Sequence, residues 1–291
     1  MNFGHAWEHV RLLSDETRNE AMLQVMARRC PGARVVEVGC GTGLLSCIAA
    51  KMGAKKVYAV EPTSQVQAAR QMVEENGLGH IVEVIEGMVQ EVPVQEVDFA
   101  FSELLNADPF AEGVLEAMAG VRPWLAEGGF SSPTRLRVYA ALIREGDSAR
   151  EVRHARQQIR RFSQRFDLKL DHLDHQLAHP GAYTYVHHVR ELASAPALIW
   201  DLSVGHSETP EDPVELRFIV REAGPVGGAV LWFEADLDEG VVMNNVAGDE
   251  SHWGQLVSGW PKEYGLGTGD GITVLVNPTE DGVTIEPVRD E

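Results

Sequence analysis

The feature that most constrains this chain is a glycine-rich turn at residues 39–43, which follows an apolar run at Val35–Val38. Glycine tolerates positive φ and lets a ligand approach the backbone closely, and a helix that begins after such a turn directs free N–H groups at the ligand. Glu61 lies 18 residues after Gly43, at the end of a second apolar run, where a carboxylate can accept the hydroxyls of a ribose. The pattern predicts a doubly wound α/β domain that binds a cofactor containing adenosine.

The spacing of the glycines distinguishes between cofactors. A dinucleotide fingerprint reads G-x-G-x-x-G, whereas this chain reads G-x-G-x-G and has Leu44 where the third glycine would fall. No Gly-Lys-Ser/Thr follows, which excludes a phosphate-binding P-loop. S-adenosylmethionine (SAM) fits better, because it has no phosphate and its carboxylate can use the end of the helix. The alternative is an ordinary glycine turn without a ligand, and the placement of Glu61 argues against it.

The pattern of apolar residues along the sequence changes near Gly129. Before it, short apolar runs alternate with helical patterns, as in a parallel sheet that is buried on both faces. After it, alternating runs separated by turns predict a β-sandwich or β-barrel. We therefore expect an N-terminal helix and a Rossmann-like domain at 1–130, and a β-rich domain at 131–291. The expected strands are Val35–Val38, Lys56–Val60, Ile81–Glu86, Val97–Phe101, Arg135–Ile143, Val214–Val220, Ala229–Leu237, Val241–Asn245, Ile272–Val276 and Val283–Ile285.

Smaller features complete this prediction. Ser64 with Gln67 forms an expected capping box, and Trp124, Trp200 and Trp232 are expected in the core. The stretch 171–204 is poorly patterned. We expect no metal site, and we interpret the spaced histidines there as part of a polar helix or arm; these are His172, His175 and His179.

Composition limits the partners and the compartment. The 291 residues carry 44 acids against 25 bases, a net charge of −19, and a field of this sign repels nucleic acid. Three cysteines without a pairing pattern favour a reducing, cytoplasmic setting. We expect no signal peptide and no membrane span, because the first 30 residues are polar and no apolar run approaches ~20 residues. The arginine-rich stretch 151–165 predicts a solvated helix face, with an anion or partner site as the alternative.

Two glutamates point to the chemistry. The apolar run Val97–Phe101 is followed by Glu103, and Glu112 comes nine residues later, after a loop containing Pro109. Ligand crevices lie beyond the carboxyl ends of parallel strands, so both side chains are expected at the reactive end of the cofactor. Two adjacent carboxylates repel unless a cation lies between them, and a planar guanidinium matches them bidentately. The alternative is a pair of ordinary surface acids, which a chain with 44 acids makes common.

Together with Ser251-His252-Trp253, these motifs resemble the protein arginine methyltransferase family over 9–145 and 228–260. The resemblance implies a SAM-binding Rossmann-like domain followed by a β-barrel domain, with S-adenosylhomocysteine as product. It implies that Glu103, Glu112, His252 and Trp253 bind the substrate, and that the catalytic residues are Glu103, Glu112, His252 and Asp15. The cofactor-binding residues that we expect are Arg18, Glu37, Gly39, Cys40, Gly41, Gly43, Leu44, Glu61, Pro62, Met88, Val89, Gln90 and Glu103. Of these, Arg18 would hold the SAM carboxylate, and Asp15 would pair with His252.

Departures from the family pattern concern the substrate. The Tyr-Phe-x-x-Tyr segment does not precede the first helix, and the aromatic and glycine residues usual after the first glutamate are replaced by Leu104, Asn106 and Ala107. We therefore expect something close to the monomethylating branch, or a bacterial-type member, that acts on free arginine or a small guanidino compound rather than protein arginine. The resemblance also implies a homodimer with a short arm near 172–190. The alternatives are a SAM-dependent methyltransferase of another nucleophile, or a SAM-binding scaffold without catalysis.

Overall fold

A computed structural model describes residues 11–93, 95–144, 147–170, 173, 183–189, 191–248, 251–279 and 282–288. The chain divides into two compact units. The first comprises Met1–Arg137, Asp201–Thr209 and Glu234–Asn244, and the second comprises Val138–Trp200, Pro210–Phe233 and Asn245–Glu291. The expected division after residue 130 remains a prediction.

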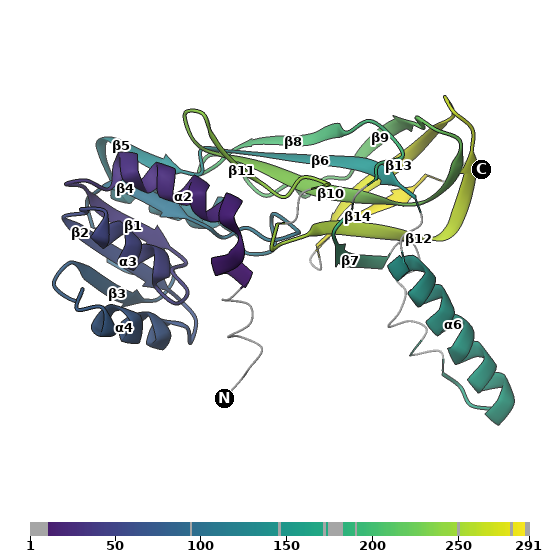
Figure 1. Ribbon diagram of the computed structural model, residues 1–291, viewed down its shortest axis with the longest axis horizontal. Coiled ribbons are helices and arrows are strands. Elements are labelled where there is room, and N and C mark those ends of the chain that lie inside the picture. Colours follow the sequence, from purple (N-terminus) through teal and green to yellow (C-terminus); the bar gives the residue numbers. More distant parts are fainter. Residues whose placement is uncertain are drawn as a thin grey trace. The chain divides into compact units, whose positions relative to one another are not determined.

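A five-stranded parallel sheet forms the centre of the first unit, in the order β3-β2-β1-β4-β5 (Figure 1). The order reverses between β1 and β4, and open α/β sheets bind ligands beyond the carboxyl ends of their strands at such a point. Every residue of β1 after Arg34 is buried, as expected for a strand covered on both faces. The elements are α2 (Glu16–Arg29), β1 (Arg34–Val38), α3 (Leu44–Lys51), β2 (Lys56–Glu61), α4 (Val66–Glu75), β3 (Val82–Glu86), β4 (Val97–Ser102), α5 (Val114–Val121), η1 (Arg122–Trp124) and β5 (Leu125–Ser132).

Helix α2 is fastened at its C-terminal end. Arg29 donates from Nε and Nη2 to the two carboxylate oxygens of Asp238, at 2.9 and 2.7 Å, and its guanidinium lies 3.8 Å from the ring centre of Phe130. These bonds hold the pKa of Asp238 below its usual value. Arg18 lies eleven residues earlier in the same helix, so the bonds made by Arg29 also restrict the position of Arg18.

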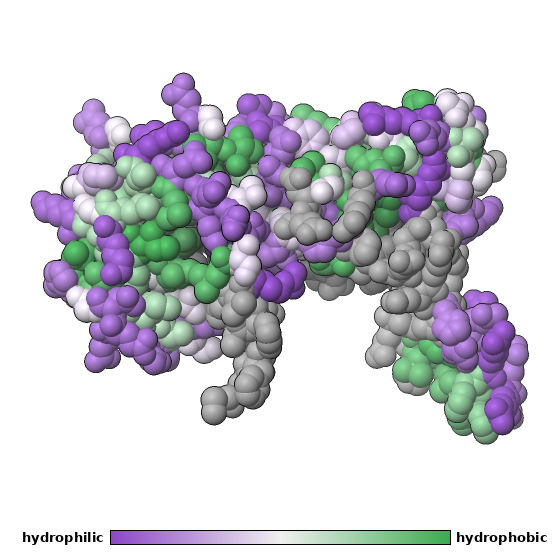
Figure 2. All heavy atoms as spheres, in the orientation of Figure 1, coloured by the Kyte–Doolittle hydropathy of each residue, from purple (hydrophilic) through white to green (hydrophobic). Residues whose placement is uncertain are grey.

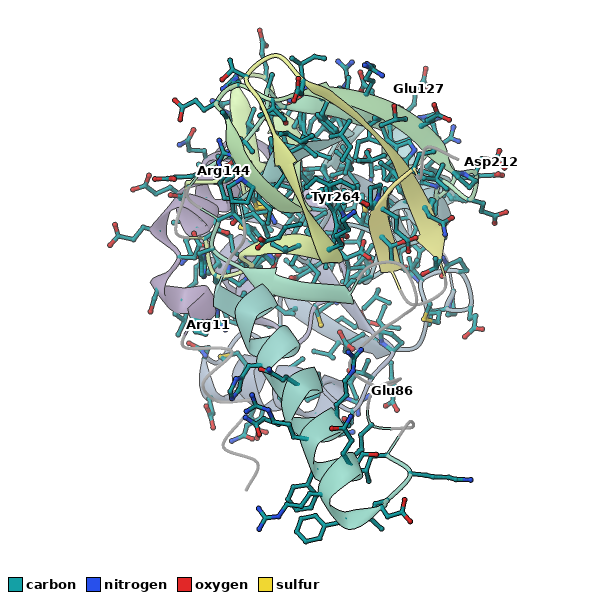
Figure 3. The ribbon with its side chains drawn as sticks, turned by 90° about the vertical axis from the view of Figure 1, so that its right-hand side faces the viewer. Arg11, Glu86, Glu127, Arg144, Asp212 and Tyr264 are labelled. Atoms are coloured by element: carbon teal, nitrogen blue, oxygen red, sulfur yellow. The ribbon has the colours of Figure 1, made fainter. Side chains whose placement is uncertain are left out.

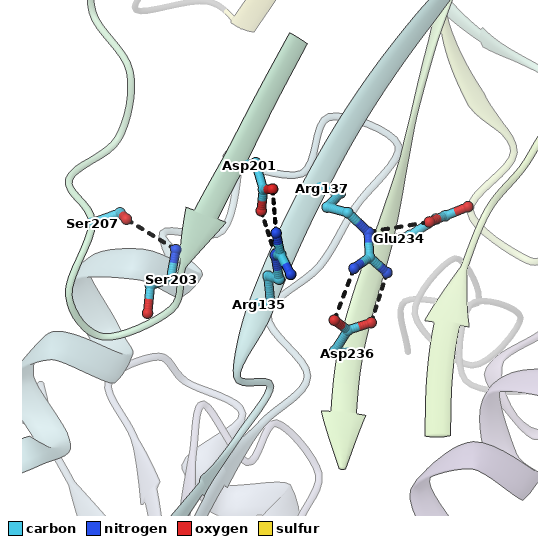
Figure 4. Close-up of polar contacts among 7 residues, drawn as sticks. All are labelled: Arg135, Arg137, Asp201, Ser203, Ser207, Glu234 and Asp236. Atoms are coloured by element: carbon cyan, nitrogen blue, oxygen red, sulfur yellow. Dashed lines mark hydrogen bonds and ion pairs between the residues drawn. The ribbon is translucent and has the colours of Figure 1, made fainter. Parts of the chain in front are cut away.

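A second set of ion pairs joins chain segments of the first unit that are distant in sequence (Figure 4). Arg137 bridges to both oxygens of Asp236, at 2.9 and 2.7 Å, and reaches Glu234 at 3.3 Å. Arg135 pairs in the same bidentate way with Asp201. The insertions 201–209 and 234–244 are thereby held to the end of the N-terminal segment by charge-assisted hydrogen bonds.

The second unit is built from antiparallel strands. One sheet has the order β7-β12-β10-β6-β8, with β11 beside β10, and a three-stranded sheet has the order β14-β13-β9. Strands β6, β8 and β10 contribute residues to both units, and β11 belongs to the first unit. The strands are β6 (Arg135–Ile143), β7 (Tyr183–His187), β8 (Ala197–Ser203), β9 (Val214–Ile219), β10 (Gly224–Asp238), β11 (Val241–Asn244), β12 (Gln255–Leu266), β13 (Gly271–Thr279) and β14 (Gly282–Pro287).

Aromatic side chains fill the core of this unit. Trp260 is fully buried and donates its indole N–H to the Ile285 carbonyl at 2.8 Å. The ring of Tyr264, a residue labelled in Figure 3, meets the Trp260 ring edge-on with 5.7 Å between the ring centres. Trp232 stacks on Tyr139 at 5.8 Å within a separate apolar cluster. The three tryptophans expected in the core, Trp124, Trp200 and Trp232, are all buried, which confirms that prediction.

Helix α6 (Asp147–Phe166) extends away from the strands of the second unit (Figure 1). Its described arginines are exposed, as the sequence predicts. Phe162 and Phe166 are also exposed, by 55% and 49%, and the centres of their rings lie 4.6 Å apart. Hydrophobic residues gather on one side of the far end of this helix (Figure 2). The expected arm at 172–190 mostly lies outside the described residues, although residues 183–187 form β7 and pair with β12.

The sequence prediction is accurate for four of the five parallel strands and incomplete elsewhere. All ten expected strands are present, whereas β5, β7, β8 and β12 were not expected. The expected capping box at Ser64 and Gln67 is wrong, since α4 begins at Val66 without a side-chain cap. In its place, Thr63 bonds to the Glu61 carboxylate and accepts from Gln65 N–H at 3.2 Å.

The cysteines and the helices of the described residues bear on two expectations. Cys30, Cys40 and Cys47 are free thiols and all are buried. In that part of the chain, none of the helices has both the length and the apolar character needed to cross a membrane.

A buried amide network fixes the turn that carries Ser251-His252-Trp253. Asn245 accepts from Phe233 N–H at 2.8 Å and donates to the Gly254 carbonyl at 2.7 Å. Gln255 accepts from Val189 N–H at 2.7 Å and donates to the Asn245 carbonyl at 2.9 Å. Both amides are fully buried, so each bond satisfies a backbone group that water cannot reach.

Asn245→Ala should lower the free energy of unfolding by about 3 kcal/mol, because it leaves two buried backbone groups without partners. Urea denaturation followed by tryptophan fluorescence measures the change. Val242→Thr, at an exposed position of β11, is the control and should stay within about 0.5 kcal/mol of the parent. An Asn245→Ala protein as stable as this control would show that the network contributes little.

Candidate functional site

A cavity of about 760 Å³ lies at the carboxyl ends of β1, β2 and β4, within the first unit. This size is typical of sites for small molecules and cofactors. Among the lining residues five carry a carboxyl group, and Arg18 is the one with a basic side chain. The lining residues are Leu12, Leu13, Arg18, Glu37, Val38, Gly39, Cys40, Gly41, Thr42, Leu44, Leu45, Val60, Glu61, Pro62, Thr63, Met72, Gly87, Met88, Val89, Gln90, Glu103, Leu104, Glu112, Gly113, Glu116 and Ala117.

The glycine turn serves two purposes. Gly39 and Gly41 adopt φ values of 73° and 52°, and a Cβ at Gly39 would lie 2.5 Å from the Leu104 side chain. A Cβ at Gly41 would meet no atom within 4 Å, so the backbone there faces open space. Gly43 does not line the cavity, since a Cβ on it would meet the Ala69 Cβ at 3.2 Å. Gly43 is therefore a packing residue between α3 and α4.

Glu61 is held in place before any ligand arrives. One of its carboxylate oxygens accepts from Gly41 N–H at 2.8 Å, and the other accepts from Thr63 N–H at 2.9 Å. The side chain is 4% exposed. The Thr63 hydroxyl donates to the same oxygen as Thr63 N–H, at 2.5 Å. The carboxylate thus joins the end of β2 to the glycine turn, and the oxygen that accepts from Gly41 keeps a lone pair.

Arg18 and Glu103 form a buried ion pair. Asp15 caps α2 by accepting from Arg18 N–H at 2.9 Å, which places the Arg18 side chain in the cavity. Its Nη2 donates to Glu103, and its Nη1 donates to Asn19 Oδ1 at 2.9 Å. Arg18 Nε is buried and has no hydrogen-bond partner in the described part of the chain. A buried N–H donor without a partner points to an anionic ligand group.

Both predicted glutamates line this cavity. Burial raises the pKa of Glu103 to about 7, and the Arg18 guanidinium opposes this rise while the negative charges of Glu112 and Asp15 add to it. Partial removal from water also raises the pKa of Glu112, although its side chain keeps solvent access, and a hydrogen bond from Asn106 opposes that shift. The Asn106 Nδ2–Glu112 Oε1 distance is 3.0 Å.

Glu37 is a third buried carboxyl group in this cavity. Burial raises its pKa to about 8, which a hydrogen bond from the Ser46 hydroxyl only partly offsets. The charge of nearby Glu103 raises the pKa further, and Arg18 lowers it. The cavity therefore holds protons at neutral pH that a cationic ligand would displace.

The expected adenine contacts lie on the segment after β3. Met88, Val89 and Gln90 line the cavity together with Pro62; Met88 is 46% exposed and Val89 is buried. Gln90 donates from Nε2 to the Glu116 carbonyl at 3.0 Å, so this segment is tied to α5.

His252 and Trp253 belong to the second unit. Their rings lie 4.1 Å apart, and Trp253 meets Phe233 edge-on at 5.3 Å. Trp253 and Ser251 are buried there. The pairing of His252 with Asp15, and the contact of His252 and Trp253 with substrate, remain predictions.

Of the expected cofactor and glutamate residues, all but Gly43 line one cavity. Sequence reasoning missed the apolar contributors Leu12, Leu13 and Met72, of which the first two lie shortly before Asp15. It also missed Glu116, which lies in α5 four residues after Glu112 and accepts a hydrogen bond from the Thr209 hydroxyl. In the described ranges, no cluster of three or more metal-ligating side chains occurs; the three spaced histidines lie outside them.

Comparisons with known proteins identify what this chain is similar to. Residues 35–129 match the family model described as "Methyltransferase domain". The chain is 34% identical over 151 residues to "Probable protein arginine N-methyltransferase 6" of Arabidopsis thaliana, covering 50% of this chain and 35% of that protein. It is 33% identical over 153 residues to "Protein arginine N-methyltransferase 1" of Caenorhabditis elegans, covering 50% and 44%. The chain thus spans less than half the length of these curated relatives.

Solved structures resemble the whole described fold. A Trypanosoma brucei PRMT1 enzyme-prozyme heterotetrameric complex with AdoHcy superposes with a TM-score of 0.79 at 19% identity, covering 97% of this chain and 93% of that chain. Protein arginine methyltransferase 10 of Arabidopsis thaliana gives a TM-score of 0.77 at 22% identity, covering 94% and 88%. At these identities the likeness shows the fold, a parallel α/β methyltransferase domain with an antiparallel β-rich domain, which confirms the predicted fold class.

Glu37→Gln should flatten the pH dependence of stability in the absence of ligand. The folded protein keeps a proton on Glu37 up to about pH 8, whereas the unfolded chain releases it near 4.5, so the free energy of unfolding falls as pH rises between these values. One such group contributes up to about 1.4 kcal/mol per pH unit. Urea denaturation at pH 5.5, 6.5 and 7.5 measures the slope, and equal slopes for the two proteins would contradict the burial of an uncompensated carboxyl group.

Proposed function

We propose that this protein is a SAM-dependent N-methyltransferase acting on a guanidino nitrogen of arginine. The observation that carries the proposal is one cavity in which two carboxyl groups, Glu103 and Glu112, lie beside a glycine turn and a buried arginine. The relatives named above support it, since they are described as arginine methyltransferases. The short coverage of those relatives leaves the activity, the substrate and the partners as proposals.

The cavity suits the cofactor chemically. Arg18 offers a buried N–H donor to a carboxylate, and Glu61 offers preorganised acceptors to ribose hydroxyls. Gly41 leaves space for an aliphatic chain against the backbone, and residues 88–90 line the region for the adenine. Bound there, SAM would supply an activated methyl group, and S-adenosylhomocysteine would be the product. An AdoHcy complex among the similar structures supports this assignment.

The two glutamates would hold and orient the substrate. Glu103 has one oxygen engaged by Arg18, and Glu112 has one engaged by Asn106; among the described residues, neither second oxygen accepts a hydrogen bond. Two such oxygens match the N–H groups of a planar guanidinium. Their negative charge would keep the positive charge away from the reacting nitrogen, whose lone pair then points along the methyl-transfer axis.

The other expected roles fit around this clamp. We propose that His252 pairs with Asp15 and, with Trp253, closes the pocket over the substrate. We favour free arginine or a small guanidino compound over protein arginine, and a single methyl transfer, because Leu104 and Asn106 replace residues usual in the family. The free thiols of Cys30, Cys40 and Cys47 support a cytoplasmic location.

A homodimer is the proposed assembly, and α6 is the element that supports it. Ile159, Phe162 and Phe166 follow the spacing of one helix face, and the two phenylalanines are exposed. Exposed aromatic residues on an extended helix are typical of an association surface. The arm would then lie before the stretch 172–190, where the family resemblance implied it.

Two alternatives remain. A methyltransferase of another nucleophile would have to place its substrate among five carboxyl groups, which disfavours any anionic acceptor. A SAM-binding scaffold would bind cofactor without transfer. Turnover of an anionic acceptor would support the first alternative, and cofactor binding without transfer to any guanidine would support the second.

The deciding experiment offers methyl-labelled SAM with free arginine, short arginine peptides and a protein extract, and separates the products by mass spectrometry. We expect label in monomethylarginine from the free amino acid. Label in protein alone would correct the substrate class, and label in dimethylarginine would correct the product.

Glu103→Gln should reduce methyl transfer at least 100-fold while SAM still binds, because a neutral amide cannot balance the guanidinium charge. Isothermal titration calorimetry with S-adenosylhomocysteine measures cofactor binding separately from turnover. Glu91→Gln, an exposed change outside the cavity, is the control and should retain full activity. Retained activity in Glu103→Gln would refute the clamp.

Replacing Phe162 and Phe166 together by serine should convert the dimer to a monomer, because it removes the exposed apolar face of α6. Light scattering coupled to size-exclusion chromatography measures the mass in solution. The control replaces Gln157 and Gln164, exposed polar residues of the same helix, also by serine. It should leave the mass in solution unchanged. A dimer that survives the phenylalanine changes would place the interface elsewhere.

A further inference from the structure

We propose that Asn106 is a positioning residue for the substrate: its side-chain amide holds Glu112 in the orientation that receives the guanidinium. The inference rests on the proposed function, and it assigns a role to a residue that does not itself line the cavity. The carrying observation is the hydrogen bond from Asn106 Nδ2 to Glu112 Oε1, at 3.0 Å.

The two glutamates of the cavity are held by different chemistry. Glu103 is bonded to a charged guanidinium, that of Arg18, whereas Glu112 is bonded to a neutral amide. A neutral donor orients a carboxylate without cancelling its charge. Glu112 therefore keeps its full attraction for a substrate cation, which a lysine or arginine at position 106 would oppose.

The amide of Asn106 is itself fixed. Its Oδ1 accepts from Ala107 N–H at 2.7 Å, so the acceptor side of the amide faces a backbone donor and the donor side faces Glu112. This pair of contacts specifies which end of the amide is oxygen and which is nitrogen. Leu105 and Ala107, the neighbours on either side, are buried and hold the backbone at this point.

The backbone of Glu112 is also fixed, which leaves its side chain as the variable part. Phe110 N–H bonds to Asp108 Oδ1 at 3.0 Å, and Gly113 N–H bonds to the Phe110 carbonyl at 3.0 Å. Gly113 then turns the chain into α5 with φ of 69°, a value that favours glycine. With the loop tied in this way, Asn106 is the described group that restricts the rotamers of the solvent-accessible Glu112 side chain.

Three variants separate this role from a structural one. Asn106→Ala removes both side-chain bonds. Asn106→Ser keeps an oxygen that can accept from Ala107 N–H but is too short to reach Glu112. Asn106→Gln keeps an amide donor. If Asn106 acts through Glu112, the alanine and serine variants should raise KM for the guanidino substrate about tenfold, the change expected when one hydrogen bond to a charged group is lost.

The same variants should change kcat by less than KM, and glutamine should restore part of the loss. Binding of S-adenosylhomocysteine, measured by calorimetry, should stay within twofold of the parent. In a Glu112→Gln background, Asn106→Ala should have little further effect on KM, because the two side chains then act as one unit. Independent effects in this double-mutant cycle, or full recovery with serine, would overturn the inference.

A readout that needs no turnover accompanies the kinetics. In Asn106→Ala the pKa of the Glu112 carboxyl should rise above its value in the parent, because the bond that opposes the effect of burial is gone. Carbon-13 NMR titration of glutamate carboxyl groups, with Glu112→Gln to assign the signal, measures this shift. The other charged groups around the cavity stay unchanged in both proteins; they are Arg18, Glu37, Glu61, Glu103 and Glu116.

The outcomes distinguish the two proposals. If the parent transfers no methyl group to any guanidine, the proposed function fails, and the substrate role of Asn106 fails with it even where the NMR shift is seen. If the parent is active and Asn106→Ala matches it in KM and in the pKa of Glu112, the positioning role alone is overturned.

Discussion

The buried pair of Arg18 and Glu103 is the interaction on which the cavity depends. Removing two charges from water is unfavourable, and their attraction offsets it only where the geometry is good; breaking such a pair typically costs about 3–5 kcal/mol. The pair joins the first turn of α2 to the carboxyl end of β4, so the N-terminal helix becomes a wall of the cavity. A ligand set that brings both a carboxylate and a guanidinium can exchange this one pair for two new ones without leaving a buried charge unmatched.

The buried carboxyl groups of the cavity also carry a desolvation cost. Glu37 and Glu103 have pKa values of about 8 and 7 because burial disfavours their charged forms. Among the described lining residues Arg18 is the one basic side chain, and it pairs with Glu103, so a proton on Glu37 reduces the remaining negative charge in the absence of ligand. A sulfonium and a guanidinium are permanent cations that would replace that proton. The composition of the site thus favours cationic ligands on electrostatic grounds, independently of any resemblance.

The sequence was sufficient where the determinants are local. The glycine turn, Glu61 and the four parallel strands follow from spacing and apolar runs, and the structure has them within one or two residues. The capping box failed because Thr63 bonds to Glu61, a contact made by the buried carboxylate at the end of β2 rather than by the helix. Strand β12 was missed because its pairing with β7 and β10 joins segments far apart in sequence. Asn106 was noted only as a departure from the family, since a single loop amide gives no signal of the side chain it holds.

Helix α6 contributes little to the core of its own unit. Its composition is basic in a chain of net charge −19, and its far end exposes two contacting aromatic rings. Helices in water derive most of their stability from burying an apolar face, and a face left in solvent contributes nothing to it. These features are the reason for proposing α6 as the association surface of a homodimer, since a second copy of this chain, with its 44 acids, would complement a helix of basic composition.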